Sequence, residues 1–355
     1  MADLRGSAHG RNAALAHRAL DLLSAALDGL GRRVVLFRYG DLVFVTFGLF
    51  AALGAFVTLA WLGVILLGQG LAPELFAVFT LSGSLVVVAA SWLLAQLFDY
   101  RLLLANPRAA LRRPVFISWG GILGIFIVLG LFAPVSGFSA LLLLDALARS
   151  VPLGHALGRL GCLSYGCCFG RPTSLRLAIT YRNPSAKAVR VGGLQHVRLH
   201  PAAFYEAVLG IGIVVVTNAA AVLGAPRGVP AALGMILYGL GRFGIEFVRN
   251  NDGRIVRGLL SLNHLLSLAL AGVGFIAWPV LHHAAQATPV ISWTMASAAV
   301  PWLVPGVVPA CLLIFVGFSL HRGRVGAWEP VRVSTAHRKR TRRASMVTRR
   351  AATHN

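Results

Sequence analysis

The stretch from His155 to Thr173 concentrates residue types that can hold a phosphorylated lipid. Glycine lets a backbone approach a ligand closely, and an arginine fork grips a phosphate with two parallel hydrogen bonds. Because the stretch follows a long apolar segment, we interpret it as a phospholipid headgroup site at the end of a membrane helix. Its candidate binding residues are Gly158, Arg159, Gly161 and Gly170.

Ionisable residues inside apolar segments are the second group of candidates, since charges at membrane depth are costly and functional by default. Asp145 and Arg149 are spaced i,i+4, as are Arg242 and Glu246, so each pair shares a helix face and can neutralise itself. A structural pairing is an equal alternative for the first pair. The set is completed by Arg159 and Glu206.

The cysteines of the same stretch offer a different chemistry. With His155, the thiols of Cys162, Cys167 and Cys168 are possible soft metal ligands or a redox group. Their spacing matches no zinc pattern, adjacent side chains point in different directions, and buried inert thiols are commoner. We therefore predict no metal ion and no cofactor, and the redox role stays an alternative.

The elements that position these residues are membrane helices. The chain is 57% hydrophobic and 12% charged, whereas a soluble domain is about 25% charged. A spanning helix needs about 20 apolar residues. We predict an all-α polytopic transmembrane helical bundle with spans near 42–68, 75–98, 115–133, 138–157, 203–224, 230–248, 258–281 and 297–320.

Four regions follow from this pattern. We expect a basic amphipathic extension over 1–37, which lies on the membrane surface or is simply solvated. A core of about seven spans covers 38–281 and contains a signature loop over 154–200. An extra span lies within 282–321, and a basic disordered tail covers 322–355.

The net charge of +22 comes almost entirely from arginine. On a membrane chain such charge orients the helices and contacts anionic lipids, so we predict membrane lipids and no nucleic acid as partners. Arginine-rich connections alternate with connections that lack Lys and Arg. The positive-inside rule then places both termini and the 158–200 loop in the cytoplasm.

Five short motifs together resemble one family. Gly158-Arg159-Leu160-Gly161, closed by Gly170-Arg171-Pro172, resembles the signature of the prolipoprotein diacylglyceryl transferases, membrane enzymes that attach a diacylglyceryl group to the lipobox cysteine of bacterial pre-lipoproteins. Each motif alone is weak, but all five follow the family's order. The other four are Arg38-Tyr39-Gly40, His200-Pro201 with Tyr205-Glu206, Arg242 with Glu246-Phe247 and Arg249, and Gly258-Leu259-Leu260-Ser261.

The resemblance implies a transferase of the bacterial plasma membrane, with phosphatidylglycerol and a lipoprotein precursor as partners. Arg159 and Arg242 would hold the lipid phosphate, and Glu246 would orient Arg242. The family reaction occurs on the outer face of the membrane, opposite to the face that the arginine bias gives the signature loop. Further substrate-binding candidates are Tyr39, Asp145, His200 and Tyr205.

The chain departs from the family pattern at three polar positions. Trp119 stands where the resemblance predicts a histidine, and Cys162 and Cys167 stand where it predicts asparagine and glutamate. His155, His200 and Glu206 are alternatives for the base that deprotonates the thiol. A divergent member that lacks catalysis or is redox-active, and binds lipid or an envelope partner, remains the alternative function. A solute transporter is a third option, although no internal repeat is visible.

Overall fold

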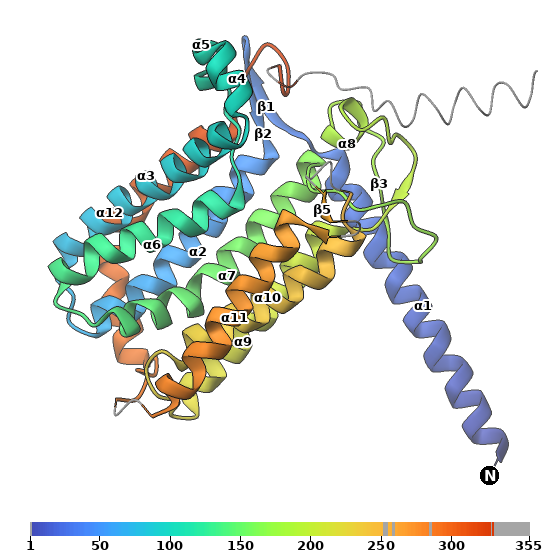
Figure 1. Ribbon diagram of the computed structural model, residues 1–355. Coiled ribbons are helices and arrows are strands. Elements are labelled where there is room, and N and C mark those ends of the chain that lie inside the picture. Colours follow the sequence, from blue (N-terminus) through green and yellow to red (C-terminus); the bar gives the residue numbers. More distant parts are fainter. Residues whose placement is uncertain (1, 251–254, 258–259, 284–285, 328, 330–355) are drawn as a thin grey trace, which may run out of the picture.

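The computed structural model describes residues 2–250, 255–257, 260–283, 286–327 and 329. Within this part of the chain, eight helices are long and apolar enough to cross a membrane. They pack side by side in one bundle (Figure 1), which confirms the predicted all-α polytopic architecture. They are α2 Thr46–Gly68, α3 Pro73–Phe98, α6 Ser118–Ser136, α7 Ala140–Tyr165, α9 Ala202–Val222, α10 Val229–Val248, α11 Leu262–His282 and α12 Trp293–Ser319.

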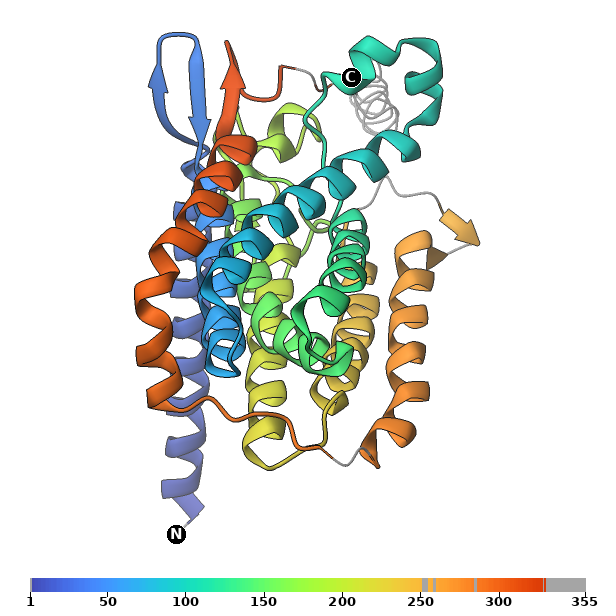
Figure 2. The same ribbon diagram turned by 90° about the vertical axis from the view of Figure 1, so that its left-hand side faces the viewer.

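The strands and the short helices α4, α5 and α8 lie at one end of the bundle, and the longer helix α1 extends away from it (Figures 1 and 2). The strands form three small antiparallel sheets, ordered β1-β2-β7, β3-β4 and β5-β6. The strands are β1 Val35–Tyr39, β2 Leu42–Val45, β3 Ile179–Thr180, β4 Arg198–Leu199, β5 Ile255–Arg257, β6 Leu260–Ser261 and β7 Leu320–Arg322, and the remaining helices are α1 Ala2–Arg32, α4 Tyr100–Ala105, α5 Pro107–Leu111 and α8 Lys187–Arg190.

The last span is integrated into the bundle rather than appended to it. Helix α12 packs along α2 and α3, and strand β7, which follows it, pairs with β2 before the first span. The Ser319 hydroxyl also donates to the Val45 carbonyl at 3.1 Å. The chain therefore enters and leaves the bundle at the same end. The predicted tail lies outside the described residues from 330 onward.

The basic connections share that end. Helices alternate in direction, so the described residues of 99–117, 166–201 and 249–261 lie at one end of the bundle, and those of 69–72, 137–139, 223–228 and 283–292 lie at the other. In the second group Arg227 is the one Lys or Arg of the sequence. The arginine-rich connections thus share one end of the bundle, and the connections poor in Lys and Arg share the other. Which end faces the cytoplasm stays a prediction.

Helix α7 is longer than the sequence predicted. We expected it to end near 157, but it continues through Pro152 to Tyr165, so Gly158, Arg159 and Cys162 are helical rather than part of a loop. It ends at Gly166, which adopts a left-handed φ of 73° and donates its N–H to the Cys162 carbonyl at 2.9 Å. Glycine takes this conformation without steric cost.

Residues 166–201 form a packed cap over the end of the bundle. Ile179, Tyr181 and Leu199 are buried in one apolar cluster with Leu163 of α7 and Leu27 of α1. The Asp28 carboxylate accepts a hydrogen bond from the Thr180 N–H at 2.7 Å. The second half of α1 is therefore held to this cap.

The first half of α1 extends past the bundle and crosses the direction of the spans (Figure 1). Along α1, the Leu15 and Leu22 side chains are 63% and 72% exposed. Leucines exposed beside a bundle end suit a helix that lies in the membrane interface, so the surface location remains our prediction for α1.

Several spans meet backbone to backbone through glycine. A Cβ atom on Gly54 of α2 would lie 2.5 Å from the Gly154 carbonyl oxygen of α7. A Cβ on Gly239 of α10 would lie 2.5 Å from the Ser267 carbonyl oxygen of α11. Lipid tails are as apolar as the helices, so close contact between small residues is a main source of helix association.

We predict that Gly54→Ala destabilises the protein by about 1–3 kcal/mol, because the added methyl must push two backbones apart. Gly130→Ala in α6 is the matched control, since a Cβ there meets nothing within 4 Å. Thermal unfolding in detergent measures both variants. Equal melting temperatures for the two variants would contradict the proposed backbone contact.

Candidate functional site

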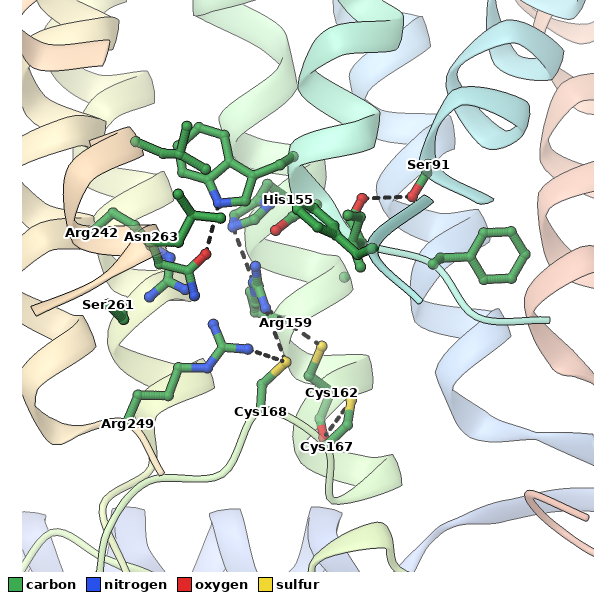
Figure 3. Close-up of a pocket in the computed structure, with 18 of the residues that line it drawn as sticks. Ser91, His155, Arg159, Cys162, Cys167, Cys168, Arg242, Arg249, Ser261 and Asn263 are labelled. Atoms are coloured by element: carbon green, nitrogen blue, oxygen red, sulfur yellow. Dashed lines mark hydrogen bonds between the residues drawn. The ribbon is translucent and has the colours of Figure 1, made fainter. Parts of the chain in front are cut away.

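A cavity of about 650 Å³ lies at the cap end of the bundle. Helix α7 contributes His155, Gly158, Arg159 and Cys162 to its wall, and the residues that follow the helix contribute Cys167 and Cys168. Figure 3 shows how these side chains converge on one space. The opposite wall comes from α6, α10 and the start of α11, with Trp119, Arg242, Arg249, Ser261 and Asn263.

The centre of the site is a fully buried carboxylate. Glu206 of α9 has 0% side-chain exposure and lies 2.8 Å from Arg159 Nη2, 3.6 Å from Arg249 Nη1 and 3.8 Å from Arg242 Nη1. His155 Nε2 lies 3.6 Å from the same carboxylate. One acidic group thus gathers arginines from two different helix ends, α7 and α10, around the cavity.

These ion pairs are held by the attraction of opposite charges and not by well-aligned hydrogen bonds. Among the described residues, neither Glu206 oxygen accepts an aligned hydrogen bond, and Arg242 Nη1 donates none. Three guanidinium groups face the two carboxylates of Glu206 and Glu246. Guanidinium groups held near the cavity by charge can turn towards a phosphate, which they bind through paired hydrogen bonds.

Arg242 is positioned by a second chain of contacts. Its Nη1 lies 2.6 Å from Glu246 Oε2, as the i,i+4 spacing predicted. Glu246 Oε1 also accepts hydrogen bonds from Asn263 Nδ2 at 2.8 Å and from the Ser261 hydroxyl at 3.2 Å. The Trp119 indole, which stands where the family resemblance predicts a histidine, donates to Asn263 Oδ1 at 3.0 Å.

The cysteines lie beside the arginines. Cys168 Sγ accepts hydrogen bonds from Arg249 Nη2 at 3.1 Å and from Arg159 Nη1 at 3.4 Å. The sulfur contacts with Cys162 and Cys167 lower the pKa of the Cys168 thiol, and the guanidinium groups of Arg249 and Arg159 lower it further, against the opposing effect of burial. These contacts favour the thiolate form of Cys168 over the thiol.

The predicted glycines have three different roles. Gly158 lines the cavity. Gly161 lets α7 approach α2, since a Cβ there would lie 3.0 Å from Phe47. Gly170 lets the cap backbone approach the start of α9, where its N–H donates to the His200 carbonyl at 3.1 Å.

Other predicted residues lie outside the described wall of this cavity. Tyr39 is 77% exposed on β1. His200 Nδ1 and the Tyr205 hydroxyl contact each other at 3.3 Å, so this pair fixes the entry to α9 instead of lining the cavity. A direct lipid contact for these three residues stays a prediction.

Asp145 lies at the far end of α7, about 21 Å from Arg159 at the helical rise of about 1.5 Å per residue. Its carboxylate accepts hydrogen bonds from the Gly228 and Ala231 N–H groups at 2.7 and 3.0 Å, and so caps α10. Arg149 donates instead to Asn218 and to the Pro289 carbonyl. Among the described residues no ion pair joins Asp145 to Arg149, so the predicted pair does not form. Backbone N–H groups and the Thr288 hydroxyl are the hydrogen-bond partners of Asp145 instead.

The sequence analysis placed Arg249 in a family motif but gave it no role in the site. The signal was present, because Arg249 follows Glu246 by three residues and so lies on nearly the same helix face. Ser261 and Asn263 gave no such signal, because their role depends on how the start of α11 meets the end of α10.

The sequence model for prolipoprotein diacylglyceryl transferase matches residues 34–280, which include the arginines, carboxylates and cysteines of this site. The chain belongs to the prolipoprotein diacylglyceryl transferase family. The family match begins after α1 and ends before α12. The chain is therefore a multi-pass membrane protein of a transferase family.

Several curated relatives are named as members of this family. A phosphatidylglycerol-prolipoprotein diacylglyceryl transferase of Clostridium tetani is 28% identical over 166 residues, which are 46% of this chain and 64% of that protein. One from Dehalococcoides mccartyi is 29% identical over 225 residues, or 61% of this chain and 82% of that protein. One from Nitratidesulfovibrio vulgaris is 33% identical over 169 residues, or 46% of this chain and 59% of that protein.

We predict that Glu206→Gln destabilises the protein by about 3–5 kcal/mol, because it leaves two buried arginines and the partly buried Arg249 without their shared counter-charge. Glu74→Gln is the control, since Glu74 is an exposed residue in the first turn of α3. Thermal unfolding in detergent gives the comparison. A Glu206→Gln protein as stable as the Glu74→Gln control would mean that the carboxylate does not hold the cluster.

We also predict that Cys168 reacts with iodoacetamide well below pH 8.5, the region where an ordinary thiol ionises. Because its pKa is lowered, the thiolate persists as pH falls and is lost only below that lowered pKa. Mass spectrometry of chelator-washed protein measures the rate against pH. Arg249→Gln should move this profile to higher pH, and an unmoved profile would exclude the guanidinium effect.

Proposed function

We propose that this chain transfers a diacylglyceryl group from phosphatidylglycerol to the thiol of a lipobox cysteine in lipoprotein precursors of the bacterial plasma membrane. The observation that carries this proposal is the grouping of Arg159, Arg242 and Arg249 around Glu206 on one cavity. The names of the curated relatives support the choice of donor and acceptor.

The reaction requires charge stabilisation at the departing phosphate. The thiolate attacks the glyceryl carbon, the bond between that carbon and the phosphate oxygen breaks, and glycerol 1-phosphate leaves with the electron pair. Preorganised positive groups lower the free energy of such a transition state. Arg159 and Arg242 are suited to this role because both line the cavity and both are held near one carboxylate.

Two apolar grooves next to the cavity suit the acyl chains of a phospholipid. One, of about 370 Å³, lies between α2, α3, α6 and α7 and shares His155 and Gly158 with the polar cavity. The other, of about 350 Å³, lies between α6, α7 and α10 and also reaches His155. A lipid can therefore keep its headgroup beside the arginines and its tails among apolar side chains.

His155 is the best placed of the three candidate bases. It lines the cavity, and its Nε2 accepts a hydrogen bond from Arg159 Nε at 3.1 Å, which fixes that nitrogen as unprotonated. Glu206 lies 3.6 Å away and would stabilise the imidazolium formed when His155 takes the thiol proton. His200 contacts Tyr205 instead.

A second candidate function, lipid binding without transfer, is favoured by Trp119. Its indole lines the cavity and is fixed to Asn263, so a large apolar ring stands where the family resemblance predicts an ionisable one. Expression in cells depleted of their own transferase separates the two functions. Conversion of pre-lipoprotein to the lipidated form supports transfer, and its failure with correctly inserted protein leaves lipid binding.

We predict that Arg159→Lys and Arg242→Lys each reduce transfer by at least about 100-fold, the typical cost of losing one transition-state donor. Lysine keeps the charge but cannot form the bidentate fork. Purified protein, phosphatidylglycerol vesicles and a lipobox peptide provide the assay. Arg227→Lys, at the other end of the bundle, should retain activity, and equal activity of all three variants would remove the arginines from the mechanism.

A further inference from the structure

The fold brings together three thiols that the sequence spacing left apart. The Sγ atoms of Cys162, Cys167 and Cys168 all lie within 4.8 Å of one another. A tetrahedral zinc ion with Zn–S bonds of about 2.3 Å holds its sulfurs about 3.8 Å apart. Small side-chain rotations are therefore enough to place all three sulfurs around one ion.

The backbone is bent in a way that favours this convergence. Gly166 and Cys168 both have left-handed backbones, with φ of 73° and 55°. The Gly166 and Cys167 N–H groups both donate to the Cys162 carbonyl, at 2.9 and 3.2 Å. A left-handed residue with a Cβ costs about 1–2 kcal/mol, and strain of this kind tends to occur at functional sites.

Two backbone hydrogen bonds hold the chain that follows Cys168. The Asn250 N–H donates to the Phe169 carbonyl at 3.1 Å, and the Arg171 N–H donates to the Val248 carbonyl at 2.8 Å. These bonds tie the residues after the cysteines to the end of α10. The thiols are thereby held next to Arg249, as Figure 3 shows.

The surrounding charge suits a metal bound by thiolates. Zinc with three thiolates carries a net charge of −1, and Arg249 and Arg159 already donate hydrogen bonds to Cys168 Sγ. Outer hydrogen bonds of this type orient ligands and tune the metal. Arg159 Nη1 also lies 3.9 Å from Cys162 Sγ, so its guanidinium group bridges two of the three sulfurs and must turn aside when an ion binds on their cavity side. The two arginines would balance the charge of the thiolate site.

We propose that Cys162, Cys167 and Cys168 bind a zinc ion whose fourth coordination position opens into the cavity. All three cysteines line that cavity. Three protein ligands with one open position is the arrangement of catalytic rather than structural zinc. Cys167 and Cys168 also line a neighbouring cavity of about 310 Å³, which provides an entry path for the ion.

The open position would receive the acceptor thiol, a role that rests on the proposed transfer reaction. The acceptor thiol binds as a thiolate and its proton passes to His155. Its sulfur then forms the bond to the glyceryl carbon as the carbon–oxygen bond breaks, and the electron pair leaves with glycerol 1-phosphate. Zinc keeps its oxidation state and holds the acceptor ionised below the usual thiol pKa of about 8.5.

Metal titration of the purified full-length chain tests the site. Chelator-stripped protein should bind about one Zn²⁺, and Co²⁺ should give an intense sulfur-to-cobalt charge-transfer band. Cys162→Ser, Cys167→Ser and Cys168→Ser should each weaken binding by more than the roughly 10–100-fold that loss of an outer-shell partner causes. Cys311→Ser is the matched control, because Cys311 lies in α12 and outside the cluster.

If a cysteine variant fails to fold, zinc binding by the unsubstituted protein still tests the site. Absence of zinc binding by that protein overturns the site. So does unchanged affinity in all three cluster variants. A disulfide between two of the cluster cysteines in protein alkylated at lysis, with no metal bound, would replace the zinc site by a redox pair.

The role in transfer is tested separately from the site. A lipobox peptide with cysteine should change the visible spectrum of the cobalt protein, and the same peptide with serine should not. Metal binding without lipidation of precursors would leave the zinc site standing and remove the transferase function. Lipidation that survives all three cysteine substitutions would keep the transferase function and exclude the zinc ion from its mechanism.

Discussion

The site depends on one carboxylate, Glu206, which balances the positive charge of several guanidinium groups that are shielded from water. Arg159, Arg242 and Arg249 come from two helix ends, and their mutual repulsion would drive α7 and α10 apart without Glu206 between them. A charge removed from water is stable only when it is closely paired. Glu206 therefore decides both where α9 meets its neighbours and where a phosphate can be held.

The sequence predicted what depends on length and periodicity. Eight apolar runs of spanning length became eight helices, and the i,i+4 spacing of Arg242 and Glu246 became an ion pair. The end of α7 was wrong by eight residues, from 157 to 165, because helix continuation there depends on the cap that covers its last turn. Polar residues in that turn look like a loop when the cap is unknown.

The sequence pattern could not predict contacts between segments that are far apart in the chain. Asp145 caps α10 through N–H groups 83 and 86 residues away, so its neighbour on the helix face, Arg149, was a misleading guide. The cysteine cluster needed two left-handed residues, Gly166 and Cys168, separated by a single position. Spacing rules for metal sites assume regular backbone and do not register such a turn.

The antiparallel pairing of β2 with β7 has a consequence for biogenesis. Strand β2 lies between β1 and β7, and the Val45–Ser319 bond that closes this clasp joins residues 274 positions apart. One edge of β2 must therefore remain unpaired until the ribosome has delivered all eight spans, and an unpaired edge is a template for wrong partners. Strand β7 thus completes a sheet that begins before the first span, and a nascent chain that stops before β7 would keep that sheet open.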